Sequence, residues 1–251
     1  MYPEIKIIGL TGIPVIRPGD NLAEIILASA GRQGVEIADG DVIVITQKIV
    51  SKAEGRLINL DEVLPSSFAL EIAKKTGKDP RYVEVILKET KNIVKITDKI
   101  LIMETKHGFI CANAGVDRSN VSKHEIVALL PKDPDKSARQ IQREIKRKIG
   151  VEVAVIISDT FGRPWREGHI NVAIGVAGMK PITDYRGKKD MFGYVLKVTT
   201  MAIADELASA AELVMGKTKG IPVAILKGFK YPIGDGTAKE LIRPPEKDLF
   251  R

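Results

Sequence analysis

The sequence predicts an α+β (mixed α/β) protein with a mixed sheet, which is neither a Rossmann fold nor a P-loop fold. The chain has 251 residues, of which 44% are hydrophobic and 28% charged, a balance that permits a sizeable globular core. Strand-like and helix-like segments follow one another without strict β-α-β alternation, which argues against a doubly wound parallel sheet. Because no long Gly/Ser-rich or Pro-rich linker occurs, we expect residues 1–251 to form a single unit of two intertwined lobes.

The first half of the chain opens with a predicted strand at residues 5–8, followed by a turn-rich stretch at 9–14. Asp20 is then placed to cap a helix that stops at Gly31. Residues 41–46 (DVIVIT) are mostly β-branched and predict a buried strand. Its end delivers a group of polar side chains, Gln47, Lys48, Ser51 and Lys52. Further on we expect helices near 66–76 and after Pro80, short strands at 93–96 and 99–103, and a loop at 111–120.

The second half begins with a predicted helix at residues 135–148, which ends at Gly150 and carries six basic side chains. Residues 151–158 give the strongest buried-strand pattern in the chain, and residues 159–168 then break all regularity. The pattern predicts the longest helix at residues 196–215 and a last strand at 221–226.

Familiar nucleotide-binding motifs are absent. There is no Gly-x-Gly-x-x-Gly. Gly216-Lys217-Thr218 resembles the end of a P-loop, but Ala211 stands where that motif needs glycine. The predicted order of helix then strand is also the reverse of a P-loop.

Three features of the sequence bear on the cellular compartment. A single cysteine, Cys111, excludes an internal disulfide, and no apolar run approaches the roughly 20 residues that span a bilayer. The acidic start of the chain does not resemble an export signal. We therefore expect a cytoplasmic protein without a membrane segment.

The net charge of +7 and a pI near 9.3 suit an anionic partner such as a nucleotide, a phosphorylated metabolite or a nucleic acid. The basic helix would be the natural nucleic-acid surface. Its charges are spread around the helix and few aromatic residues are present to stack bases, so a solvated helix face is favoured and no nucleic acid is expected.

Two aspartates are candidate ligands for a hard metal ion. Asp117 lies in the irregular 111–120 segment, and Asp159 directly follows the buried strand, with Thr160 beside it. Carboxylate oxygens suit Mg²⁺ or Mn²⁺, especially in sites that also hold phosphate. An aspartate after a strand also serves as a helix cap or turn residue, so position alone leaves both interpretations open.

Other polar groups gather near these acids in sequence. Arg163 and Arg166 flank Trp165, and a guanidinium suits capture of carboxylate or phosphate, although most arginines are simply at the surface. In the 196–215 helix, Asp205, Ser209 and Glu212 share one face. That face either lines a site or is exposed, and the small residues around it are equally compatible with close packing or a subunit contact.

Several segments together resemble the coenzyme F-420:L-glutamate ligase family. They are residues 9–14 (GLTGIP), 41–55 (DVIVITQKIVSKAEG), 112–120 (ANAGVDRSN), 158–168 (SDTFGRPWREG), 204–216 (ADELASAAELVMG) and 240–251 (ELIRPPEKDLFR). Each motif is weak alone, whereas the set spans nearly the whole chain.

The resemblance implies a two-lobed ligase fold, a homodimer, and GTP-dependent addition of L-glutamate to the deazaflavin coenzyme precursor F-420-0 through an acyl phosphate. It allows a second, γ-linked glutamate, and it implies Mg²⁺ or Mn²⁺ together with K⁺. Asp117, Asp159 and Thr160 are the implied metal ligands, and Arg163 is expected to hold an anionic substrate group. The implied nucleotide contacts are Leu10, Thr11, Gly12, Ile13, Lys48, Asn120, Met215 and Gly216.

Two other functions remain open at this point, a metal-dependent nucleotide phosphohydrolase and a basic nucleic-acid-binding module. The sequence also leaves open which group takes the proton of the glutamate amine, with Asp205, Glu206 and Glu212 as candidates.

Overall fold

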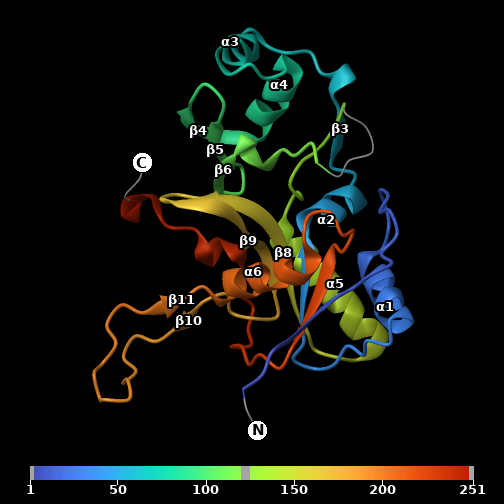
Figure 1. Ribbon diagram of the computed structural model, residues 1–251, viewed down its shortest axis with the longest axis vertical. Coiled ribbons are helices and arrows are strands. Elements are labelled where there is room, and N and C mark those ends of the chain that lie inside the picture. Colours follow the sequence, from blue (N-terminus) through green and yellow to red (C-terminus); the bar gives the residue numbers. More distant parts are fainter. Residues whose placement is uncertain (1–2, 120–124, 249–251) are drawn as a thin grey trace.

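The computed structural model describes residues 3–119 and 125–248, built around a five-stranded sheet (Figure 1). In spatial order its strands are β1 (Lys6–Gly9), β12 (Val223–Lys227), β2 (Val42–Thr46), β8 (Ala154–Arg163) and β9 (Arg166–Ala177). β2 and β8 run parallel, and the other neighbours are antiparallel. The prediction of an α+β protein with a mixed sheet, neither Rossmann nor P-loop, is confirmed.

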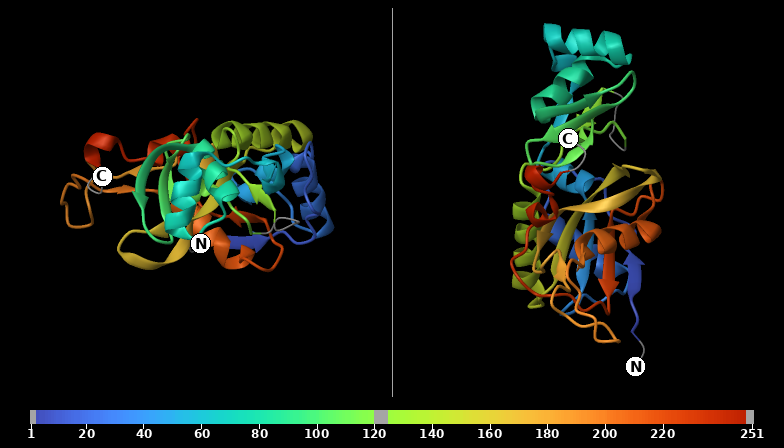
Figure 2. Two further views of the ribbon diagram at one scale, coloured as in Figure 1. Left: turned by 90° about the horizontal axis from the view of Figure 1, so that it is seen from above. Right: turned by 90° about the vertical axis from the view of Figure 1, so that its left-hand side faces the viewer.

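Helices cover both faces of this sheet (Figure 2). α5 (Pro134–Ile149), with α1 (Leu22–Arg32) beside it, packs on one face, and α6 (Ile203–Met215) packs on the other. The short helix α2 (Gln47–Ala53) follows β2 without a break. The ends of α5 follow the sequence signals closely, since Asp133 accepts a hydrogen bond from the Lys136 amide at 3.0 Å and Gly150 ends the helix at φ 76°.

Residues 57–129, here called the insert, leave the sheet after α2 and return before α5. The insert contains β3 (Leu57–Asn59), α3 (Ser67–Thr76), α4 (Pro80–Glu89), β4 (Thr90–Ile96), β5 (Leu101–Thr105), β6 (Ile110–Ala112) and β7 (Ile126–Ala128), with short 3₁₀ turns at Leu60–Glu62 and Asn113–Gly115. It has a hydrophobic cluster of its own, separate from the large cluster around the sheet (Figure 1). Its two ends are tied together, because the Leu129 amide donates to the Arg56 carbonyl at 3.0 Å and Arg56 Nε donates to the Leu130 carbonyl at 3.1 Å.

The prediction of an irregular segment at 159–168 is wrong, because these residues continue β8 and turn into β9. Asp159 pairs with Val172 and Phe161 with Ile170. The ladder is irregular between Phe161 and Arg163, and Trp165 at the tip adopts φ 64°. Glycine and proline at the tip suggested a loop, whereas the residues before them pair as a long hairpin. Similarly, Cys111 lies in β6 and not in a loop.

The long helix predicted at 196–215 is also wrong in its first turns. α6 begins at Ile203, and α5, with 16 residues, is the longest helix among the described residues. The preceding residues belong to a projecting arm made by β10 (Thr183–Asp184) and β11 (Thr200–Met201) and the loop between them (Figure 1). The helical spacing of Leu196 and Thr200 was therefore coincidental, and the β-branched residues here favour extended backbone. Within the described chain, no helix combines the length and apolar character that crossing a membrane requires.

Candidate functional site

Four chain segments converge at one edge of the central sheet. The carboxyl ends of β1, β2 and the regular part of β8 lie at this edge, and β12 begins there. Thr46 and Ser158 are paired at the carboxyl ends of the parallel strands. The Leu10 amide donates to the Val223 carbonyl at 2.8 Å, and the Thr46 amide donates to the Pro222 carbonyl at 2.9 Å. In open sheets with parallel strands, ligands bind outside such carboxyl ends.

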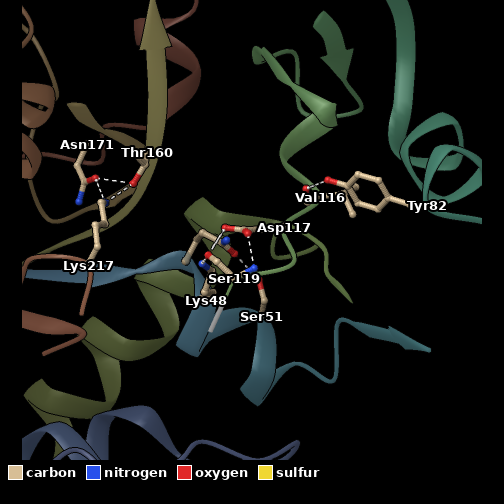
Figure 3. Close-up of polar contacts among 10 residues, drawn as sticks. Lys48, Ser51, Tyr82, Val116, Asp117, Ser119, Thr160, Asn171 and Lys217 are labelled. Carbon is tan, nitrogen blue, oxygen red and sulfur yellow. Dashed lines mark hydrogen bonds and ion pairs between the residues drawn. The ribbon is translucent and has the colours of Figure 1, made fainter. Parts of the chain in front are cut away.

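Asp117 comes to this edge from the insert and meets Lys48 of α2. Lys48 Nζ lies 2.7 Å from Asp117 Oδ2 and 2.5 Å from Ser119 Oγ (Figure 3). The Ser119 amide also donates to Asp117 Oδ1 at 2.6 Å. Burial opposes ionisation of Asp117, but the Lys48 ammonium prevails and holds the pKa of that carboxyl below its usual range.

Asp159 lies close enough to Asp117 for their charges to interact. Burial raises the pKa of Asp159 to about 6, and repulsion by Asp117 adds to this, while Lys48 and Lys217 act in the opposite direction. Asp159 forms no ion pair with any residue in the described ranges. The structure therefore brings the two predicted acids together and leaves one of them without a cation of its own.

Thr160 is next to Asp159 in sequence, but its side chain points to the opposite face of β8 because side chains alternate along a strand. Lys217 Nζ lies 2.5 Å from Thr160 Oγ1 and 3.1 Å from Asn171 Oδ1, and Thr160 Oγ1 donates to Asn171 Oδ1 at 2.8 Å (Figure 3). The third predicted ligand is thus engaged by an ammonium group.

Lys217 is the site residue that the sequence analysis missed. It appeared there only as part of an incomplete P-loop motif. The sole signal for it was a lysine following a helix-ending glycine, and its partners, Thr160 and Asn171, are distant in the sequence.

The predicted nucleotide-contact segments flank the two acids. The Leu10–Ile13 loop is held by the end of α1, since the Thr11 amide and hydroxyl both donate to Gln33 Oε1, at 2.9 and 2.8 Å, and Arg32 donates to the Gly12 carbonyl at 3.1 Å. Met215 and Gly216 end α6 just before Lys217. Asn120 lies outside the described residues.

The predicted arginines do not join this group. Arg163 lies near the hairpin tip, where its guanidinium donates to the Glu167 carbonyl at 2.6 Å, and Arg166 is exposed beside it. Four residues of extended strand separate Arg163 from Asp159, which corresponds to roughly 13 Å.

The polar face of α6 packs on β9 and is not simply exposed. Asp205 Oδ1 accepts from the Ala173 amide at 2.8 Å, and Ser209 Oγ donates to the Asn171 carbonyl at 2.7 Å. Glu206, the other acid of the first turn, is exposed.

The donor set at this edge fits one hard divalent cation. No group of three or more His, Cys, Asp or Glu side chains gathers for a metal anywhere in the described ranges. Two neighbouring carboxylates, one of them without an ion pair, nevertheless match sites that complete their shell with water and phosphate oxygens. Nearby, two buried polar atoms, Gln47 Nε2 and Ser158 Oγ, have no hydrogen-bond partner in the described structure.

Comparison with known proteins gives a consistent result. Residues 11–228 match the model of the F420-0:Gamma-glutamyl ligase family. The chain is 49% identical over 252 residues to the Coenzyme F420:L-glutamate ligase of Methanothermobacter thermautotrophicus, covering 98% of this chain and 99% of that protein. It is also 49% identical to the protein of that name from Methanocaldococcus jannaschii, covering 99% and 97% of the two chains. The corresponding protein of Archaeoglobus fulgidus is 39% identical over 98% of this chain and 96% of its own length.

The matched range contains both acids, both lysines and three of the four converging segments, β2, β8 and β12, and the relatives align over nearly their whole length. This chain therefore belongs to the F420-0:Gamma-glutamyl ligase family.

Proposed function

We propose that this protein joins L-glutamate to the deazaflavin precursor F420-0 in an amide bond, with GTP as the energy source. The observation that carries the proposal is the meeting of Asp117 and Asp159 beside Lys48, at the sheet edge where four chain segments converge. Family membership supplies the substrates. The basic net charge is consistent with two phosphate-bearing substrates.

Asp117 and Asp159 would hold Mg²⁺ or Mn²⁺, which when bound neutralises phosphate charge during transfer. Lys48 and Lys217 stand on either side of these acids and contribute fixed positive charge toward the phosphates. We propose that the backbone of the 10–13 loop and of Met215 and Gly216 contacts the nucleotide. We propose K⁺ as a further ion and assign no residue to it.

The reaction has two steps. A carboxylate oxygen of F420-0 attacks the γ-phosphorus of GTP, the bond to the β-phosphate oxygen breaks, and an acyl phosphate and GDP form. The glutamate amine then attacks the acyl carbon, the C–O bond to phosphate breaks, and inorganic phosphate leaves as the nitrogen loses a proton. Positioning and charge neutralisation dominate the first step, so no covalent nucleophile on the protein is required.

The direct test is to incubate the purified protein with GTP, Mn²⁺, K⁺, L-glutamate and F420-0 and to measure the molecular mass of the deazaflavin product by mass spectrometry. We expect a mass gain of one or two glutamyl residues, which also gives the number added. An unchanged mass under all these conditions would refute the proposal. Replacing GTP with ATP tests the nucleotide preference. Equal turnover with both nucleotides would refute the proposed preference for GTP.

Asp159→Asn tests the metal assignment. The variant keeps the shape of the side chain and removes its charge, so kcat should fall by roughly 100-fold or more while binding of F420-0 changes little. Asp98→Asn, an exposed aspartate in the turn between β4 and β5, is the matched control and should behave as the wild type. Near-normal turnover of Asp159→Asn at saturating Mn²⁺ would remove the assignment.

The two alternative functions make distinct predictions. A phosphohydrolase would release phosphate from GTP without glutamate or F420-0, whereas the ligase requires both. A nucleic-acid module would use the basic face of α5. Three of its basic residues are already paired with glutamates, Lys146 with Glu152, Arg147 with Glu144, and Lys148 with Glu24.

A further inference from the structure

A cavity lies along the seam between the insert and the central sheet. It has a volume of about 230 Å³ and is bounded by β6 and the turn before it, by β8 and β9, by the start of α6, and by the C-terminal segment. Phe109 and Phe161, whose rings meet edge to face with centroids 6.2 Å apart, form part of the wall with Val172. Three charged residues also line it, Asp205, Arg243 and Asp248, and Arg243 Nη1 donates to the Lys247 carbonyl at 3.4 Å.

This cavity adjoins Asp159 through the register of the hairpin. Val172 is the residue directly opposite Asp159 on β9, and Phe161 follows Asp159 by two positions and shares its face of the strand. Directly paired residues have Cβ atoms about 5 Å apart. A small molecule in the cavity would therefore place its end beside the proposed phosphoryl-transfer centre.

The lining has the chemistry of a site for a free amino acid. Asp205 provides a carboxylate for an ammonium group, Arg243 provides a guanidinium for a carboxylate, and the phenyl rings provide apolar contact for methylene groups. Pockets for drug-sized ligands occupy roughly 300–1,000 Å³. The smaller volume here suits an amino acid better than a tricyclic deazaflavin ring.

We propose that this cavity binds the acceptor L-glutamate, with Asp205 facing its ammonium group and Arg243 one of its carboxylates. The proposal rests on the ligase function proposed above. It also distinguishes the three acids left open by the sequence: Asp205 lines the cavity, Glu206 is exposed, and Glu212 lies 3.6 Å from Lys217.

Asp205 is well fixed for this role. Its Oδ1 accepts from the Ala173 amide at 2.8 Å, which anchors the first turn of α6 to β9. Asp205→Asn preserves that acceptor atom and removes the charge, so the fold is retained while the ammonium partner is lost.

The first test is Arg243→Met, which removes the charged guanidinium of an exposed residue and keeps an unbranched apolar side chain. We expect KM for L-glutamate to rise roughly 10- to 100-fold, because a charge-assisted hydrogen bond is lost, while KM for GTP and for F420-0 stays within about 2-fold. Arg147→Met, an exposed arginine of α5, is the matched control and should match the wild type. An unchanged KM for glutamate, or equal rises for all three substrates, would overturn the assignment of Arg243.

The second test is Asp205→Asn, for which we expect the same selective rise in KM for glutamate. In addition, Arg243→Lys should recover part of the affinity for glutamate that Arg243→Met loses. If neither Asp205→Asn nor Arg243→Met changes KM for glutamate selectively, the cavity is not the acceptor site. Wild-type turnover separates the two proposals. A wild-type enzyme that makes no glutamyl product refutes the ligase function, whereas normal wild-type turnover with unaffected variants refutes only the cavity.

Discussion

Tyr82 shows how a single hydroxyl connects α4 of the insert to the proposed metal ligand. Its phenol donates to the Val116 carbonyl at 2.7 Å, one residue before Asp117 (Figure 3). The guanidinium carbon of Arg118 lies 4.4 Å from the centroid of the Tyr82 ring. Tyr82→Phe leaves that carbonyl without its partner. We expect a loss of about 1–2 kcal/mol in the free energy of unfolding in urea. A change below the error of the measurement would show that this hydrogen bond contributes nothing.

The same residue predicts a pH dependence. Burial raises the pKa of Tyr82 to about 12, with the charge of Asp117 adding to the effect. Between pH 10 and 12 the unfolded chain therefore loses a proton that the folded chain keeps, so this contribution to stability is complete below pH 10 and disappears as the pH rises through about 12. The free energy of unfolding of the wild type should fall more steeply over this range than that of Tyr82→Phe, and parallel curves would contradict this.

At the scale of elements, the projecting arm formed by β10, β11 and their loop presents apolar side chains that the described residues leave largely exposed. Met191 is 89% exposed, Phe192 87% and Val198 85%. Clustered exposed apolar residues mark association surfaces. The arm is therefore our candidate for the subunit contact of the homodimer that the family resemblance implies.

The double variant Met191→Ser, Phe192→Ser should shift the mass in solution from dimer to monomer, because it removes much of this apolar surface. Light scattering coupled to size-exclusion chromatography measures it. Leu64→Ser, an equally exposed apolar residue of the insert at 88%, is the control and should leave the mass unchanged. A wild type that is monomeric at micromolar concentration would refute the homodimer.

Elements whose limits are encoded locally were predictable, and those that depend on distant partners were not. The buried strand at 41–46 and the helix ending at Gly150 followed from runs, periodicity and caps, whereas the strand predicted at 151–158 exists but runs from Ala154 to Arg163. The short ladder of β3 with β7 gave no local signal, because its strands have three residues each and pair across the insert. The hairpin after Asp159 was missed since its pairing depends on β9, which lies further along the chain.

For the whole molecule, the site lies where its two hydrophobic clusters adjoin. Asp117 comes from the insert, Asp159 from the sheet, and Lys48 from the helix between them. Position at strand ends and loops made the two acids and Lys48 candidates, and the family resemblance then selected them from the sequence. The role of Lys217 was not predictable, since 57 residues separate it from Thr160 and only the folded chain joins them.

The paired ends of the insert imply that the insert can be deleted from the chain. Because Arg56 and Leu129 are hydrogen-bonded neighbours, residues 57–129 can be excised and the cut closed with a short glycine linker. The trimmed chain should still unfold cooperatively by circular dichroism, at lower stability because it lacks Phe109 of the large cluster. It should also be inert as a ligase, since Asp117 leaves with the excised piece. Loss of cooperative unfolding would mean that the central sheet requires the insert in order to fold.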